Sequence, residues 1–523
     1  MKRRNENVVT YLLLLCFVVL TQAPYLFAYS QSDQMSVFSG FLFNPLDGNT
    51  YLSKIRQGWE GNWLFELTYS PENSKPAFLF VFYLLLGHIA RVLHWDLIFT
   101  FHFARLGATI CLFGALKQFF QWVMGEQKKI ILALFWVMFG GGLGWLAVLF
   151  GGFTPDFWVA EGYVFLSAFA NPHFPLSIAL MLWVLTLSSK ALEGRGNSWT
   201  ALMGGLVLAN LSPFAWIIAT ITLAAYIVCT LNSEDPMRKI MMIKRLVFFG
   251  LGGSPFLLYQ LWIMRQDVVL GEWNRQNVTP SPTILNFVMG FLPLGVWSFL
   301  GAIRAYKKKD VKELLPLLWI AISVLLVFIP SPLQRRFMIG MYIPLVVLTN
   351  NFLHEVFSDQ KLERRDAIKL WMTFSLILSF LTNVILLSAT FRAILQRDSS
   401  IFLYRDETKA YQWLSEHSQS DAVVLASPAS GMYIPARTGL RVVYGHPFES
   451  IHAQQRMLLI ENFYQGKMSP EEQRKFLTDF SIKFILWGYR EQEIANPEVL
   501  NSLKQTFPIA YHSGKITIFR VSQ

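Results

Sequence analysis

The segment AFLFVFYLLLGHIARVLHW, which runs from Ala77 to Trp95, decides how the rest of the chain is arranged. It is apolar over most of its length, and a helix needs about 20 such residues to cross the hydrocarbon core of a bilayer. It also carries His88, Arg91 and His94. Because every crossing reverses the side of the membrane for the loops that follow, this segment determines the sidedness of all later loops.

The composition is that of a membrane protein. Of the 523 residues, 53% are hydrophobic and 15% are charged, whereas a soluble protein carries roughly 25% charged residues. The deficit comes from repeated apolar runs that are long enough to span a bilayer. The formal net charge is +11, but no basic stripe alternates with exposed aromatic residues, so we expect no nucleic-acid partner.

The excess positive charge lies mostly in short loops between the apolar runs, where it sets topology. Six basic clusters occur, formed by Lys2, Arg3 and Arg4; Lys128 and Lys129; Lys190 and Arg195; Arg238, Lys239, Lys244 and Arg245; Arg304, Lys307, Lys308, Lys309 and Lys312; and Lys361, Arg364, Arg365 and Lys369. Cytoplasmic loops are enriched in lysine and arginine. If residues 77–95 crossed the membrane, the last five clusters would face the wrong side.

We therefore predict that residues 77–95 lie along the outer interface or re-enter the membrane. The predicted fold is a polytopic α-helical membrane protein with about eleven transmembrane helices, at residues 8–29, 97–123, 130–150, 174–190, 198–211, 213–231, 246–264, 284–303, 313–330, 338–354 and 370–391. This odd number leaves the N-terminus in the cytoplasm and the chain after Arg392 outside. The predicted location is the cell membrane.

The tail differs from the rest in composition. "DETKAYQWLSEH" predicts an amphipathic helix, and "DAVVLAS", "RVVYGH" and "KFILWGY" predict short buried strands. "SPEEQRKFL" contains a capping box, with Ser469 as N-cap, Pro470 first in the helix and Glu472 reaching back. We predict a transmembrane domain over residues 1–391, whose first outer loop covers about 30–96 with interfacial helices, and an extracytoplasmic soluble α/β domain over 392–523.

Asp47 follows the first predicted span, in the sequence "PLDGN". A carboxylate there can deprotonate an incoming hydroxyl or hold a metal. The alternative is that Asp-Gly-Asn forms a turn in which Asp47 caps a helix starting at Thr50 or Tyr51. The spacing by itself leaves both interpretations open.

Other polar residues of the outer loops also have two interpretations. Arg335 and Arg336 lie where the charge rule disfavours them; their guanidinium groups suit a phosphate, or they contact any anionic headgroup at the interface. Glu161 either acts on a substrate or solvates its loop. His173 orients a substrate or closes a helix mouth, and Trp273 stacks on a sugar or belongs to an aromatic belt.

The whole arrangement resembles the GT-C class of membrane glycosyltransferases, which includes protein O-mannosyltransferases, lipid A aminoarabinose transferases and oligosaccharyltransferase catalytic subunits. Members of that class cross the membrane once, continue with a long outer loop that holds membrane-parallel helices, and carry an acid just after the first span. "DGNTY" resembles an Asp-Glu-x-x-Tyr pattern of that class, matching at Asp47 and Tyr51 and departing at Gly48. Lys75-Pro76 and "FHFARL" are similar to class motifs before the interfacial helix and in the second span. Glu161 lies where members often carry an acid.

The resemblance implies transfer of a sugar from a polyprenyl-phosphate-linked donor, which enters from the membrane lipid, to a glycan, lipid or protein acceptor on the extracytoplasmic face. It implies the following roles: Asp47 as base, Glu161 as second acid, Lys75, Arg335 and Arg336 as phosphate contacts, and Tyr51, His173 and Trp273 as substrate contacts. The departure at Gly48 leaves the need for a divalent metal open. "GHPFES" and "KFILWGY" look like parts of outer domains in uncharacterised prokaryotic members, and no activity transfers with them.

Two other functions remain. A lipid or solute transporter, or flippase, usually shows internal repeats and ionisable residues at the membrane midplane, and neither is evident in the sequence. A catalytically inactive GT-C-like scaffold is the third possibility, and Gly48 in place of a second acid favours it. The long first outer loop and the large tail fit an enzyme better than a transporter.

Overall fold

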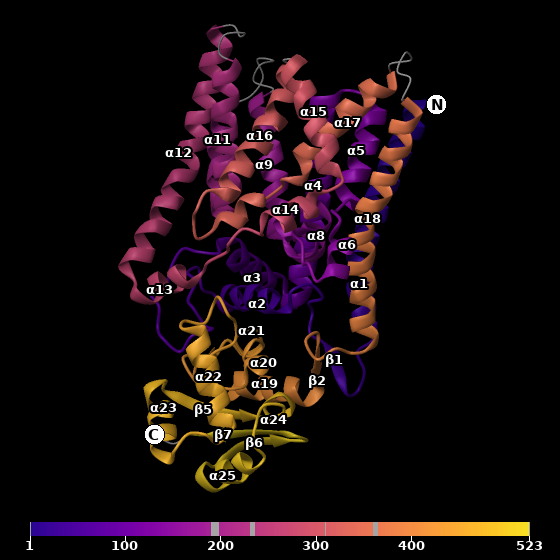
Figure 1. The fold of residues 1–523 in the computed structure, drawn as a ribbon. Coiled ribbons are helices and arrows are strands. Elements are labelled where there is room, and N and C mark those ends of the chain that lie inside the picture. Colours follow the sequence, from indigo (N-terminus) through magenta and orange to yellow (C-terminus); the bar gives the residue numbers. More distant parts are fainter. Residues whose placement is uncertain (1, 190–197, 231–235, 309, 359–364, 522–523) are drawn as a thin grey trace. The chain divides into compact units, whose positions relative to one another are not determined.

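The computed structural model describes residues 2–189, 198–230, 236–308, 310–358 and 365–521 (Figure 1). Lys190, Arg195, Lys309, Lys361 and Arg364 of the basic clusters lie outside the described residues. The chain divides into two compact units. Unit 1 contains Met1–Pro24, His102–Leu258 and Thr279–Arg392, and unit 2 contains Tyr25–Phe101, Tyr259–Val278 and Ala393–Gln523.

Eight helical segments in the described part of the chain are long and apolar enough to cross a membrane. They are α1 (Lys2–Ser30), α4 (Leu97–Met124), α5 (Gln127–Phe139) with α6 (Gly144–Ala147) and η1 (Val148–Phe150), α11 (Pro213–Thr230), α12 (Pro236–Gln266), α16 (Val311–Phe328), η4 (Gln334–Met338) with α17 (Tyr342–Ser358), and α18 (Arg365–Leu395). Each corresponds to a predicted span. The protein is therefore mostly helical and multi-pass.

The remaining three predicted spans have other geometries. α9 (His173–Ser189) and α10 (Ser198–Leu211) are apolar helices that fall short of the length of the other eight. α14 (Ile284–Phe291) and α15 (Leu294–Lys308) meet at a bend of 83° and count as one span only if taken together. The prediction of about eleven spans thus has eight direct matches, and the full number stays a prediction.

Residues 77–95 form a short helix that does not qualify as a candidate span, α3 (Val81–Leu93). It packs on α2 (Pro45–Glu60) with the two backbones in direct contact. A Cβ on Gly58 would lie 2.0 Å from the Leu84 carbonyl oxygen, and a Cβ on Gly87 would lie 2.0 Å from that of Ile55. The opposite side of α3 exposes Leu85, Ile89 and Val92, among others. An amphipathic helix of this kind is suited to an interface between lipid and water.

Short helices in unit 1 carry the second predicted outer loop: α7 (Pro155–Trp158), η2 (Ala160–Gly162) and α8 (Val164–Ala170). Arg105 of α4 supports this loop from a fully buried position. Its guanidinium donates to the carbonyl oxygens of Ala168 and Phe169, at 3.3 and 2.7 Å, and to that of Thr21 at 3.1 Å. Because the last carbonyls of a helix lack intrahelical donors, Arg105 satisfies the end of α8 and ties it to α4 and α1.

Unit 2 joins the first outer loop to the tail. β1 (Ser36–Phe38) pairs antiparallel with β2 (Phe402–Tyr404). The Tyr69 hydroxyl donates to the Met432 carbonyl oxygen at 2.8 Å, and the Val442 N–H donates to that of Thr68 at 3.2 Å. In this unit, α13 (Val268–Gln276) packs through Trp273 against Phe65 and Phe80.

The tail folds around a five-stranded mixed sheet (Figure 1). The strand order is β4 (Arg441–Val442), β3 (Val423–Leu425), β5 (Ile482–Trp487), β7 (Ile516–Arg520) and β6 (Ile509–Ser513); the first three are parallel and the last two are antiparallel to their neighbours. Its helices are α19 (Arg405–His417), α20 (Pro428–Gly431), α21 (Ile434–Thr438), α22 (Ala453–Tyr464), α23 (Pro470–Asp479), α24 (Tyr489–Gln492) and α25 (Glu498–Thr506). Two apolar clusters form its core.

Local patterns in the tail predicted these elements well. Each of the three predicted strands overlaps an observed strand, and "DETKAYQWLSEH" lies in α19. The capping box at the start of α23 is confirmed: Ser469 Oγ accepts from the Glu472 N–H at 3.3 Å, and the Glu472 carboxylate accepts from the Ser469 N–H at 2.7 Å. The boundary predicted between residues 391 and 392 stays a prediction.

Candidate functional site

Asp47 lies in the first turn of α2, one of the helices of the first outer loop. The helix begins at Pro45, and Asn44 is its N-cap, with φ 45° and a side-chain oxygen that accepts from the Asp47 N–H at 3.4 Å. The alternative in which Asp47 itself caps a helix starting at Thr50 or Tyr51 is therefore wrong. A carboxylate in the first helical turn also faces the positive end of the helix dipole.

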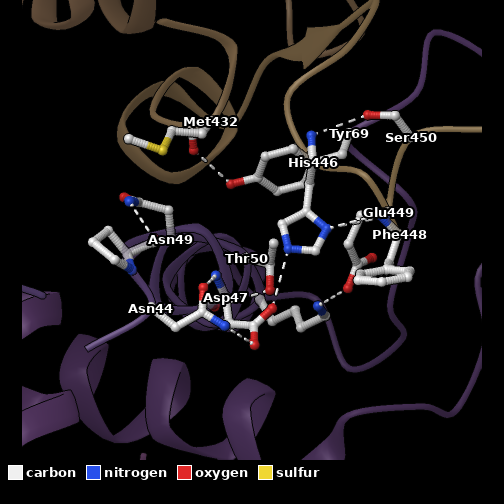
Figure 2. Close-up of polar contacts among 12 residues, drawn as sticks. Asn44, Asp47, Asn49, Thr50, Tyr69, Met432, His446, Phe448, Glu449 and Ser450 are labelled. Atoms are coloured by element: carbon white, nitrogen blue, oxygen red, sulfur yellow. Dashed lines mark hydrogen bonds and ion pairs between the residues drawn. The ribbon is translucent and has the colours of Figure 1, made fainter. Parts of the chain in front are cut away.

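Two side chains hold the carboxylate of Asp47 (Figure 2). Asn44 Nδ2 lies 2.6 Å from Oδ2, and His446 Nε2 lies 3.1 Å from Oδ1. The Asp47 side chain remains 39% exposed, whereas the His446 side chain is only 4% exposed. The result is an acid that is oriented by fixed neighbours but still reachable from solvent.

The surroundings of Asp47 on α2 are aromatic and charged. Tyr51 lies one turn further along α2, and its ring stacks on that of Tyr83 with the centroids 4.5 Å apart. Burial raises the pKa of Tyr83 well above its usual range, so this phenol keeps its proton. Lys54 forms a buried ion pair with Glu449, with Nζ 2.8 Å from Oε1. Tyr51 is half-buried, and its contact with a substrate stays a prediction.

Gly48 departs from the motif of the GT-C class for a reason of packing. A Cβ at this position would lie 2.4 Å from Cγ of Phe41, which is less than any real Cβ contact. No side chain fits unless the Phe41 ring moves. The absence of a second acid after Asp47 is therefore part of how α2 packs in unit 2.

Lys75 and Trp273 are the other predicted site residues in unit 2. Lys75 is exposed, and its backbone N–H donates to Oδ2 of Asp267 at 2.9 Å. Trp273 is only 7% exposed, because its ring packs in the core with Phe65 and Phe80. The structure gives Trp273 a packing position, and its contact with a sugar or an acceptor stays a prediction.

Unit 1 holds the other predicted residues: Glu161, His173, Arg335 and Arg336. Glu161 is buried in η2, and its carbonyl oxygen accepts from the Gly340 N–H at 2.9 Å. This bond ties the acid's loop to the chain directly after η4, which carries both arginines. The structure therefore brings the Glu161 segment and the arginine segment together, as two adjoining parts of unit 1.

Each of the two arginines stacks on an aromatic ring. The Arg335 guanidinium carbon lies 4.7 Å from the centre of the Trp158 ring, and that of Arg336 lies 5.7 Å from the centre of the Phe214 ring. Stacking of this kind orients the planar guanidinium group. His173 starts α9, is half-buried and packs on Phe174 at 4.0 Å between ring centres.

Asp156, another acid of the second outer loop, has a structural role. Its side chain accepts from the N–H groups of Gly142 and Gly144 at 3.0 and 3.1 Å and from the Thr154 hydroxyl at 2.5 Å. Burial raises its pKa, and these hydrogen bonds oppose that rise. The acid thus holds the backbone of the glycine-rich segment "FGGGLGW", which runs from Phe139 to Trp145.

Sequence reasoning missed the partners of Asp47. His446 lies in "GHPFES", a stretch that stood out in the sequence for its resemblance to outer domains and not for any chemistry. It is 399 positions from Asp47. No local pattern predicts a contact over such a distance. The capping residue Asn44 had a recognisable signal, since asparagine before a proline is a common helix start.

The side chains around Asp47 do not fit a metal site. In the described part of the chain, no three His, Cys, Asp or Glu side chains lie together in a way that could hold a metal ion. Asp47 has one histidine beside it, His446, and the ring nitrogen that faces the carboxylate is engaged in a hydrogen bond with it. These side chains do not form a metal-binding set, so we derive no step through a metal.

No protein-family model matches the chain, and no curated protein does either. Solved structures do match. The archaeal oligosaccharyltransferase AglB from Archaeoglobus fulgidus, in complex with an inhibitory peptide and a dolichol-phosphate, has a TM-score of 0.57 at 11% identity, covering 100% of this chain and 75% of AglB. The oligosaccharyltransferase from the same organism, tethered with an acceptor peptide containing the NVT sequon, has a TM-score of 0.57 at 11% identity, covering 98% and 74%.

ArnT from Cupriavidus metallidurans bound to undecaprenyl phosphate also matches, at 10% identity over 97% of each chain, but its TM-score of 0.46 is too low to carry an argument. The oligosaccharyltransferase matches extend over nearly the whole of this chain, through both the apolar helices and the tail. At this level of identity they concern the fold. The chain shares the fold of the archaeal oligosaccharyltransferase, and oligosaccharyltransferase catalytic subunits belong to the GT-C class that its sequence resembles.

Proposed function

We propose that the protein is a membrane glycosyltransferase that moves a sugar from a polyprenyl-phosphate-linked donor to an acceptor on the extracytoplasmic face, with Asp47 as base. The observation that carries the proposal is the position of Asp47, together with its hydrogen-bond partners and its exposure. It follows the first spanning helix, it is held by Asn44 and His446, and it is 39% exposed. A general base must be both oriented and accessible.

The shared fold supports the choice of donor. The archaeal neighbour AglB was solved with a dolichol-phosphate and an inhibitory peptide. A sugar linked to a polyprenyl phosphate has a leaving group that is already stable as an anion. The protein therefore needs to deprotonate the acceptor and to steady the departing phosphate, and Asp47 and a set of cations are sufficient for those two tasks.

In the proposed reaction, the acceptor atom attacks the anomeric carbon as Asp47 takes its proton. The bond between the anomeric carbon and the phosphate oxygen breaks, and its electron pair leaves with the phosphate. Asp47 later returns the proton to water. A positioned base contributes about 10²–10⁴-fold to such a step.

The other predicted residues have proposed roles in the same reaction. Lys75, Arg335 and Arg336 contact the phosphate, and the stacking of Arg335 on Trp158 presents its guanidinium edge as a fork for two oxygens. Glu161 is the second acid, and Tyr51, His173 and Trp273 contact the sugar or the acceptor.

The proposed topology has the N-terminus in the cytoplasm and the tail outside. Eight helical segments qualify as spans by length and composition. Adding α9, α10 and the bent pair α14–α15 gives eleven crossings, an odd number. Cysteine labelling at Ser420, exposed in the tail, and at Lys307, exposed at the end of α15, tests this topology. A reagent that cannot cross membranes should label the tail position and not position 307 in intact cells, and the reverse pattern would contradict the topology.

Sugar transfer by the purified protein tests the function. Wild type and Asp47→Asn are incubated with polyprenyl-phosphate sugars and a mixture of glycan, lipid and peptide acceptors. We expect transfer by the wild type and a loss of about 10²–10⁴-fold in the variant. Asp406→Asn is the matched control, because Asp406 also lies in the first turn of a helix, α19, and its side chain is 27% exposed.

The outcomes separate the candidate functions. Transfer that disappears in Asp47→Asn but persists in Asp406→Asn supports the enzyme. Flux of a lipid or solute across vesicles without a new glycosidic bond would identify a transporter. If the folded wild type neither transfers sugar nor moves substrate, the non-catalytic scaffold is the remaining function.

A further inference from the structure

One loop of the tail contacts the helix that carries Asp47 at two points. This loop, Gly445–Ser450, is called the GHPFES loop. His446 contacts Asp47, and Glu449 contacts Lys54. Asp47 and Lys54 are seven positions apart in α2, which is about two helical turns, so both lie on the same face of the helix. Figure 2 shows the His446 ring pointing from the loop toward the Asp47 carboxylate.

The loop determines which nitrogen of His446 carries the proton. Nδ1 lies 3.1 Å from the backbone nitrogen of Phe448 and 3.2 Å from that of Glu449. Both are N–H donors, so Nδ1 must be the acceptor. The proton is therefore on Nε2, the nitrogen that faces Asp47 Oδ1 at 3.1 Å. His446 is thus set up to donate to the carboxylate.

The loop is itself held in one conformation. The Ser450 hydroxyl oxygen accepts from the N–H groups of Gly445 and His446, at 3.0 and 3.2 Å. The Ser450 N–H donates to the His446 carbonyl oxygen at 2.9 Å. Gly445 passes so close to Gly431 that a Cβ would lie 2.4 Å from the Gly431 carbonyl oxygen. These contacts leave the backbone at His446 little freedom.

The second contact anchors the loop to α2. The Lys54 and Glu449 side chains are both buried, 2.8 Å apart, and Lys54 Nζ also lies 4.2 Å from the centre of the Phe80 ring. Removing one member of a buried ion pair is costly because the other charge stays behind. Glu449 Oε2 is buried with no hydrogen-bond partner among the described residues, so the pair is held by its one direct contact.

We propose that His446 is a positioning residue for Asp47, supplied by the tail through the GHPFES loop. Its Nε2–H holds Oδ1 while Asn44 holds Oδ2, and the two together fix the plane of the carboxylate toward the acceptor. This inference rests on the proposed function of Asp47 as base. It assigns the tail a part in the reaction, because the tail supplies a side chain to the site.

Two substitutions at His446 test the role. His446→Phe keeps the size of the ring but removes the donor, and His446→Gln keeps an N–H near the place of Nε2. For His446→Phe we expect kcat per folded molecule to fall about 10–100-fold, with the KM of the lipid-linked donor within about twofold of wild type, because a small misplacement of a catalytic group is costly. His446→Gln should recover kcat to within about threefold of wild type.

The control is His417→Gln. His417 is exposed at the end of α19, where Nδ1 lies 3.0 Å from the Trp413 carbonyl oxygen. It should keep wild-type kcat and KM. A purely structural role for His446 would reduce the amount of folded protein without changing kcat per folded molecule, and a single donor would not restore activity. Wild-type kcat in His446→Phe would overturn the inference while leaving Asp47 as the base.

A second measurement does not depend on sugar transfer. Thermal unfolding midpoints are compared for wild type, Asp47→Ala, His446→Phe and the double variant. Residues in direct contact give non-additive effects, so the double variant should unfold close to the less stable single variant. Additive shifts of the midpoint would contradict a direct interaction between the two side chains. If no form of the protein transfers sugar but the midpoints are non-additive, the proposed function fails and the contact stands.

Discussion

Asp47 and Asp156 occupy similar positions in their helices but differ in exposure and in the groups that they bind. Each lies in the first turn of a helix that begins with proline, α2 for Asp47 and α7 for Asp156. Asp156 is 1% exposed and accepts from two backbone N–H groups and one hydroxyl. Asp47 is 39% exposed and accepts from the side chains of Asn44 and His446.

The difference shows how the same residue serves structure or chemistry. The Asp156 carboxylate accepts hydrogen bonds from the backbone of Gly142 and Gly144, so its role is to fix that segment of the chain. Asp47 is held by groups that orient it and leave it accessible. A general base must come within hydrogen-bond reach of the proton that it takes, and of these two acids Asp47 is the accessible one. Substitutions at both sites test whether this difference in environment is also a difference in function.

The largest expected effect concerns activity per folded molecule. Asp47→Asn should lose about 10²–10⁴-fold in sugar transfer, and Asp156→Asn should stay within about threefold of wild type. An asparagine can keep the contacts of Asp156, since its oxygen accepts from Gly142 and Gly144 and its NH₂ donates to the Thr154 hydroxyl. Initial rates of transfer by the purified variants give the ratio. Equal losses at both positions would break the comparison.

The next effect concerns the backbone that Asp156 holds. In Gly142→Ala the new Cβ would lie 2.1 Å from the Gly290 carbonyl oxygen, a contact with backbone that cannot move aside easily. We expect the unfolding free energy to fall by at least about 1–3 kcal/mol. The fall is measured as a lower unfolding midpoint and a lower yield of folded protein. Gly250→Ala is the control, because no atom lies within 4 Å of a Cβ there. A Gly142→Ala midpoint matching that of Gly250→Ala would refute the close packing.

A smaller effect is expected at the phosphate contact. Arg335→Lys keeps the charge but loses the planar group that stacks on Trp158. We expect the KM of the lipid-linked donor to rise about 3–10-fold with kcat changed less, since about 1 kcal/mol of binding is lost. Arg275→Lys is the matched control: Arg275 is exposed and pairs with Glu272 in the same helix. A wild-type KM in Arg335→Lys would argue that Arg335 contacts lipid headgroups and not the donor.

The smallest effect is the pH dependence that Asp156 confers on stability. Burial raises the pKa of Asp156 in the folded protein above the ordinary value of an aspartate. A raised pKa means that the protonated acid is favoured in the folded protein, so its stabilising contribution is full below about pH 3.9 and is lost as pH rises through the folded pKa. The unfolding midpoint of wild type should therefore fall relative to Asp156→Asn as pH rises from acid toward neutral. A relative rise would show that the hydrogen bonds outweigh burial.

Much of the fold could be predicted from local patterns. The eight segments that qualify as spans, the strands of the tail and the capping box at Ser469 all follow from hydrophobic periodicity and capping chemistry. The bend between α14 and α15 was not predicted, because the apolar run over residues 284–303 is continuous and hydrophobicity along the chain does not show where a helix turns.

The sequence by itself determined that the chain is a multi-pass membrane protein and that an acid follows its first span, since hydrophobic length and residue order are local properties. Only the tertiary structure decided which acid is exposed, why Gly48 carries no side chain, and which histidine meets Asp47. Contacts such as the one between Asp47 and His446 join parts of the chain that are 399 positions apart. They depend on how α2 and the GHPFES loop pack in unit 2, which no periodicity along the chain records.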